Sequence, residues 1–142
     1  MSATSNRRLL RPIHPLHAVL LAATVPLFLG ALLSDIAYGR SEQVQWNNFA
    51  SWLIVGGMVF CGCALLWAFI GLLRRHGRTG QALLFLGLLF ATFIIGFVDA
   101  LVHAKDAWAI MPEGPILSFI VTVLAIAATW VGFSSLRAGG AE

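Results

Sequence analysis

Three ionisable side chains lie near the ends of two long apolar runs. Their residue types and their spacing suggest a metal-binding or proton-transfer site. Asp35 closes the first run, and Asp99 and His103 close a later one. Asp99 and His103 are four residues apart, so their side chains can touch on a helix. Two carboxylates and an imidazole could hold a divalent metal ion or relay a proton. The alternative is structural, with each Asp pairing with Arg40 or Lys105 or capping a helix.

A second group of histidines lies at the start of the first run. The segment IHPLHAV holds His14 and His17, and His76 lies in a later basic stretch. Imidazoles bind transition metals and haem, so His14 and His17 are candidate cofactor-binding residues for haem b. One haem cannot bridge His17 and His103, because at 1.5 Å per residue they lie about 25–30 Å apart. The structural alternative makes His14 a cap before Pro15 and places His17 among the lipid headgroups.

Other chemistry-bearing patterns are absent from the sequence. The two thiols of Cys61-Gly62-Cys63 would point about 200° apart on a helix, so they cannot converge on one metal ion. There is no glycine-rich phosphate loop, no Ser/His/Asp arrangement and no basic helix face. We therefore expect no enzyme activity and no nucleic-acid partner.

The composition places these residues in a lipid bilayer. Hydrophobic residues make up 59% of the 142 positions and charged residues only 11%, against about 25% charged in soluble domains. A spanning helix needs about 20 mostly apolar residues. Four stretches qualify: 15–38, 50–73, 82–103 and 115–136. We predict an all-α integral membrane protein, a four-helix antiparallel bundle formed by residues 13–136.

The basic residues predict the orientation of the bundle. Seven of the nine Lys and Arg residues fall on the side that holds both termini, and such residues favour the cytoplasm. Residues 1–12 would form a basic cytoplasmic segment, and 137–142 a short cytoplasmic tail. The first run could instead be a cleaved signal peptide, but it is longer than a usual signal core and no small-residue cleavage site follows it.

The helix faces suggest how the bundle packs. At 100° per residue, one polar stripe holds His17, Thr24 and Asp35, and another holds Thr92, Asp99 and His103. The other two helices carry small residues at interface spacing: Gly57, Cys61, Ala64, Ala68 and Gly71 on one, and Ser118, Thr122, Ala125, Thr129 and Gly132 on the other. We expect these four stripes to face the interior. The first and third helices both end near an Asp, which suggests a duplicated hairpin, although the flanking residues align poorly.

Three segments carry a resemblance to a known family: IHPLHAVLLAATVPLFLGALLSDIAY, QWNNFASWLIVGG and VDALVHAKDAW. Over about residues 13–133 the chain resembles a bacterial membrane family, domain of unknown function 2231. The resemblance implies a four-helix inner-membrane protein with His14-Pro15 opening the first helix and Asp35 at its outer end. It also implies an association with redox proteins, since some relatives are fused to or encoded beside iron–sulfur domains or periplasmic dehydrogenases. No iron–sulfur module is present in this chain.

These observations leave three functional hypotheses. The first is a multi-pass protein of the bacterial inner membrane that acts as an accessory or anchoring subunit for a partner at the periplasmic face, such as a periplasmic redox protein. The second is a redox or metal-binding protein that uses Asp35, Asp99 and His103, or His14 and His17 with haem b. The third is a small transporter subunit, which would need homo-oligomerisation, because four helices are few for a substrate path.

Overall fold

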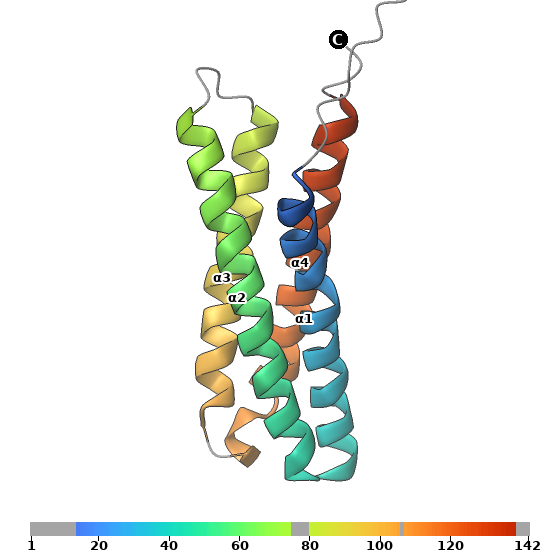
Figure 1. Ribbon diagram of the computed structural model, residues 1–142. Coiled ribbons are helices and arrows are strands. Elements are labelled where there is room, and N and C mark those ends of the chain that lie inside the picture. Colours follow the sequence, from blue (N-terminus) through green and yellow to red (C-terminus); the bar gives the residue numbers. More distant parts are fainter. Residues whose placement is uncertain (1–13, 75–79, 106, 139–142) are drawn as a thin grey trace, which may run out of the picture.

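The chain folds into four long helices and one short 3₁₀ helix (Figure 1). The computed structural model describes residues 14–74, 80–105 and 107–138, and everything below refers to these. The elements are α1 (Pro15–Ser41), α2 (Val44–Arg74), α3 (Gly80–His103), η1 (Ala107–Ile110) and α4 (Glu113–Ala138). The prediction of an all-helical fold is confirmed. The expected cytoplasmic segments, and the side chains of Arg75, His76, Arg78 and Arg137, lie outside the described residues.

The first connection is much shorter than the sequence suggested. We expected helices over 15–38 and 50–73, yet α1 continues to Ser41 and α2 begins at Val44. Glu42 turns the chain with a left-handed φ of 55°, and its N–H donates to the Tyr38 carbonyl at 2.8 Å. Hydropathy finds only the apolar part of a helix. The 31 residues of α2 extend about 46 Å, beyond a hydrocarbon core of about 30 Å.

The helices pack as neighbours around a common interior. α1 contacts α2 and α4, and α3 contacts the same two helices. The start of α1, the end of α2, the start of α3 and the end of α4 lie at one end of the molecule, here called the terminal end (Figure 1). The α1–α2 turn and η1 lie at the opposite end, here called the η1 end. Each polar stripe therefore runs between the two ends.

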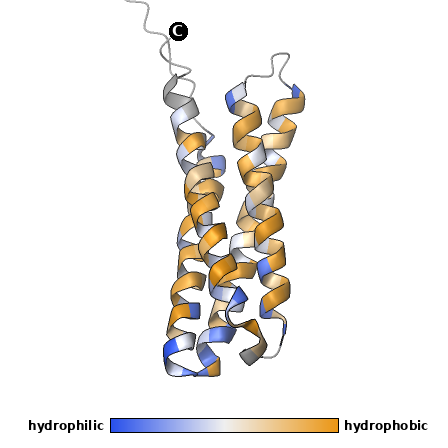
Figure 2. Ribbon diagram, turned by 180° about the vertical axis from the view of Figure 1, so that it is seen from behind, coloured by the Kyte–Doolittle hydropathy of each residue, from blue (hydrophilic) through white to orange (hydrophobic). Residues whose placement is uncertain are grey.

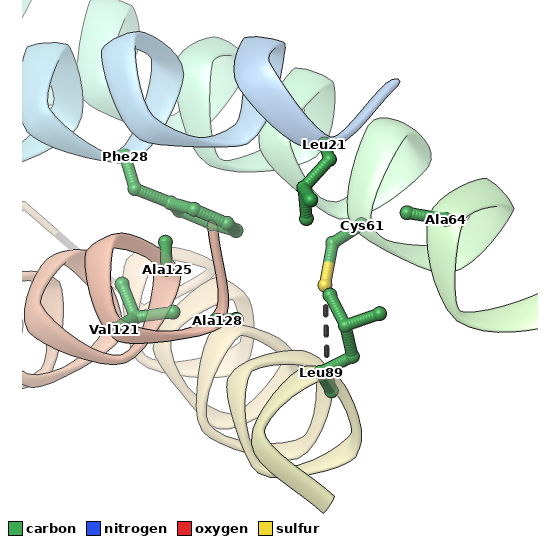
Figure 3. Close-up of a cluster of buried hydrophobic side chains, with 8 residues drawn as sticks. All are labelled: Leu21, Phe28, Cys61, Ala64, Leu89, Val121, Ala125 and Ala128. Atoms are coloured by element: carbon green, nitrogen blue, oxygen red, sulfur yellow. Dashed lines mark hydrogen bonds between the residues drawn. The ribbon is translucent and has the colours of Figure 1, made fainter. Parts of the chain in front are cut away.

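The middle of the interior is apolar and centred on Phe28. Its ring is fully buried and reaches from α1 toward Val121 and Ala125 of α4 (Figure 3). A Cβ added at Gly57 would lie 2.8 Å from this ring, and one added at Gly96 would lie 3.5 Å from it. All four helices thus come together at Phe28, α2 and α3 through glycines. The small residues of α2 and α4 allow this close approach, as their spacing predicted.

The two helix hairpins share one register. Three neighbouring pairs of α1 and α3 each join residues 68 positions apart. His17 contacts Phe85, Asp35 bonds to His103, and a Cβ added at Gly96 would lie 3.5 Å from Phe28. The same shift places LAAT of residues 21–24 on LFAT of residues 89–92. When 68 is added to the residue numbers of α1 and α2, their ranges roughly match those of α3 and α4. This register supports the suggestion of a duplicated hairpin.

The outer surface is that of a protein surrounded by lipid. All four long helices have the length and apolar composition to cross a membrane, and hydrophobic residues cover most of their length (Figure 2). Trp52 toward the η1 end and Trp130 toward the terminal end are 71% and 76% exposed. Exposed tryptophans near both ends suit the two headgroup layers, where amphipathic rings are favoured.

Candidate functional site

A closed polar network joins three helices near the η1 end. Asp35 of α1, Asp99 and His103 of α3, and Ser118 of α4 are all buried, three of them completely. His103 Nε2 lies 2.8 Å from Asp35 Oδ1. Ser118 Oγ lies 2.6 Å from Asp35 Oδ2 and 3.0 Å from Asp99 Oδ2. The structure therefore brings together all three outer residues that the sequence proposed, and it adds Ser118.

The helices fix the geometry of this network. Asp99 and His103 are one turn apart on α3, and His103 Nδ1 lies 2.9 Å from the Asp99 backbone carbonyl. Gly114 lets the first turn of α4 come close to the imidazole, because a Cβ there would lie 3.3 Å from His103 Cε1. Ser118, one turn further along α4, then lies between the two carboxylates. The alternative that each Asp pairs with Arg40 or Lys105 is not observed among the described residues.

The contacts determine how many hydrogens the network holds. The Asp99 carbonyl can only accept, so His103 Nδ1 carries a hydrogen and donates it. Three contacts remain: His103 Nε2 with Asp35 Oδ1, and Ser118 Oγ with Asp35 Oδ2 and with Asp99 Oδ2. Each of them needs one hydrogen to be a hydrogen bond. The Ser118 hydroxyl supplies only one. All three are hydrogen bonds only if two protons are shared among Nε2 and the two carboxyl groups.

With two shared protons the network would be electrically neutral. Two carboxylates and a neutral imidazole carry two negative charges, which the two shared protons cancel. A net charge would be costly here, because Asp35, Asp99 and Ser118 are all 0% exposed and buried charge without compensation is strongly unfavourable. Asp35 receives two short contacts, whereas Asp99 Oδ1 accepts no hydrogen bond. Ionised carboxylates are favoured where more donors reach them, so these contacts favour Asp99 over Asp35 as the place of a carboxyl proton.

The same geometry does not favour a metal ion at these residues. A metal needs ligand atoms that converge on one point, but the two carboxylates lie at different nitrogens of His103. Both ring nitrogens are already engaged. Within 14–74, 80–105 and 107–138, no group of three His, Cys, Asp or Glu residues could hold a metal ion. The arrangement contains groups able to hold a proton, and a metal ion at Asp35, Asp99 and His103 stays a prediction.

The histidines at the terminal end form a separate cluster. His14 and His17 both lie against Trp67 of α2, with ring centroids 5.0 Å and 5.9 Å away. The edge of Phe85 also contacts His17. Both histidines belong to the same end of α1, and His103 lies at the other end of the molecule. The described histidines thus offer no pair at one depth on two different helices, and haem b at His14 and His17 stays a prediction.

No polar path joins the two ends through the described residues. Thr24, Thr92 and Thr122 point inward, but their hydroxyls donate to carbonyls of their own helices at 2.6–2.7 Å. Phe28 fills the interior between the network and Thr24 and Thr92, which lie one turn nearer to the terminal end. The stripe from His17 to Asp35 is therefore interrupted. At the level of Asp35 the side chains of α3 and α4 bond to the stripe, whereas nearer the terminal end Thr24 and Thr92 bond to their own helices and Thr129 of α4 reaches only the Leu21 carbonyl, at 3.4 Å.

Sequence reasoning missed the role of Ser118. It assigned this residue to a small stripe for packing, because spacing alone cannot distinguish a hydroxyl that packs from one that bridges two acids. The position of Ser118 along its helix could have indicated this role. Ser118 lies near the start of α4, and an antiparallel arrangement places that part of α4 beside Asp99 near the end of α3. This indication needs the register between α3 and α4, which only the structure supplies.

Comparisons with known proteins agree with this description. Neither the curated proteins nor the solved structures contain a significant match. A family model described as Predicted membrane protein (DUF2231) matches residues 13–137, which include every residue of the network and all four long helices except the last residue of α4. It is a membrane family of unknown function, as its name states, and the multi-pass helical fold is consistent with it. The chain belongs to this family of predicted membrane proteins.

Proposed function

We propose that this protein lies in the bacterial inner membrane as an antiparallel bundle with both termini in the cytoplasm. The support is the uneven distribution of basic residues, seven of which fall on the side of the termini and two on the other. Basic residues next to spanning helices favour the cytoplasmic side. In this orientation the η1 end, and with it the network, faces the periplasm.

The function that we propose is reversible proton binding by the network of Asp35, Asp99, His103 and Ser118. The observation that carries the proposal is that Ser118 Oγ lies within hydrogen-bonding distance of both carboxylates, 2.6 Å and 3.0 Å away, with one hydrogen to donate. A proton on Asp99 completes the ring of hydrogen bonds. Its release would leave one net negative charge in a fully buried site, which the surrounding helices would have to accommodate.

This site is more consistent with an accessory subunit than with a transporter subunit. Phe28 and the backbone-bonded threonines separate the network from the terminal end, so a proton could be exchanged with one side only. A site of this kind can couple periplasmic acidity to the packing of the bundle, and thereby to a partner at the periplasmic face. It cannot by itself carry a proton across.

Infrared difference spectroscopy tests the proposal directly. A protonated carboxylic acid has a C=O stretch that ionised carboxylates lack, so the wild-type protein in detergent micelles should show this band at neutral pH. Asp99→Asn should remove it, whereas Glu113→Gln, which changes an exposed carboxyl at the start of α4, should leave it unchanged. Wild-type protein without the band from acidic to neutral pH would overturn the proposal.

A further inference from the structure

Asn47 is a buried amide that no described contact explains. It lies in the first turn of α2, only 8% exposed, on the same face as the buried residues Ala50 and Ile54. Its Oδ1 atom is buried and accepts no hydrogen bond from the described residues. The next residue, Asn48, is exposed. Buried amide oxygens in proteins are usually satisfied by protein donors or by internal water.

The register of the first hairpin places Asn47 just outside the network. His17 lies beside Trp67, and Phe28 lies on Gly57. Continued along both helices, this antiparallel register sets Asp35 level with Ala50. Asn47 then lies about one turn, roughly 5 Å, nearer to the η1 end. It occupies the level between the network and the aqueous side.

Several other buried groups lie toward the η1 end of the interior. Tyr38, Val102 and Ile110 form a buried cluster there. The titratable groups that face this region are Asp35 and Tyr38 from α1 and Asp99 and His103 from α3, while α4 contributes the Ser118 hydroxyl. Asp99 Oδ1 is a second buried oxygen that accepts no hydrogen bond, although His103 Nδ1 lies 3.1 Å from it.

We infer that Asn47 holds an internal water molecule through which the network exchanges its proton with the periplasmic side. This inference rests on the proton-binding function proposed above. A proton arriving as hydronium binds to the Asp35 carboxylate, which the register of the first hairpin places closer to Asn47 than Asp99, and leaves a neutral water at Asn47. The Ser118 hydroxyl takes the proton from Asp35 Oδ2 and gives its own hydrogen to Asp99 Oδ2, where the O–H bond forms. Release runs in reverse, with the O–H bond of Asp99 breaking and the proton leaving on the water. Asn47 is thus a positioning residue that acts through the water it binds.

The test follows the Asp99 carboxylic acid band after a rapid pH change, in wild-type protein and in two apolar variants, Asn47→Leu and Asn47→Val. Either side chain would fill the place of the amide without a hydrogen-bonding atom. Both variants should keep the full amplitude of the band at equilibrium and slow its appearance about tenfold or more, as expected for a raised barrier. Asn48→Leu, at the exposed neighbouring position, should leave the rate unchanged.

The results separate this inference from the function on which it rests. A normal band whose rate is the same in wild type and in the Asn47 variants overturns the role of Asn47 and leaves proton binding intact. No band in wild type overturns proton binding, and the role of Asn47 falls with it. Circular dichroism of each variant checks that the helices are intact, and Asn47→Val, the smaller change, decides the question if Asn47→Leu does not fold.

Discussion

Asp35 and His103 occupy equivalent positions in the two helix hairpins, 68 residues apart, and bond directly to each other at 2.8 Å. The symmetry stops there. In the first hairpin, the positions equivalent to Asp99 and Ser118 are Ala31 and Ala50, which are both fully buried. Only the second hairpin supplies the extra acid and the hydroxyl. A symmetric packing frame thus carries an asymmetric site, in which the second hairpin supplies both the second aspartate and the hydroxyl that bridges the two acids.

The Asp35–His103 pair should behave as one energetic unit. Removing one member of a buried ion pair costs about 3–5 kcal/mol, because the other is left uncompensated. We expect Asp35→Asn and His103→Gln each to lower the free energy of unfolding, and the double variant to lose about 0.5–3 kcal/mol less than the sum. Unfolding in mixed micelles measures this. Additive effects would show that the pair is not coupled.

Ser118 should matter more than its size suggests. Ser118→Ala removes the only hydroxyl between two buried carboxyl groups, and unsatisfied buried polar groups cost about 1–3 kcal/mol. Ser134 provides the matched control, since its hydroxyl bonds only to Val131 of its own helix at 3.1 Å. Ser134→Ala should change the free energy of unfolding by less than about 0.5 kcal/mol. Equal effects of the two substitutions would argue against the bridging role.

The sequence predicted the features that depend on a single helix. Apolar length identified the four spans, and the four-residue spacing of Asp99 and His103 predicted that they meet. It did not predict what depends on the register between helices: that Asp35 reaches His103, that Ser118 bridges the acids, or that Phe28 interrupts the polar stripe. It also placed the start of the second helix at residue 50 rather than Val44, because polar turns beyond the hydrocarbon leave no hydropathy signal.

The packing around Phe28 predicts opposite effects for two glycine substitutions. Gly57→Ala places a methyl group 2.8 Å from the buried Phe28 ring, and such overpacking costs about 1–3 kcal/mol. Gly87→Ala on α3 meets nothing within 4 Å and should stabilise the helix by up to about 1 kcal/mol. Unfolding of both variants in micelles compares them. A neutral Gly57→Ala would mean that the interior at Phe28 is looser than described.

The proposed orientation predicts which face of the membrane the α1–α2 turn occupies. Gln43 lies in this turn and is exposed, so a maleimide that cannot cross the membrane should label Gln43→Cys in intact cells. Wild-type protein is the control, because Cys61 is fully buried and Cys63, although exposed, lies within the span of α2. Neither should react with a reagent confined to water, since the thiolate that attacks is strongly disfavoured in hydrocarbon. Labelling of Gln43→Cys only after the cells are permeabilised would reverse the orientation, and the network would then exchange its proton with the cytoplasm.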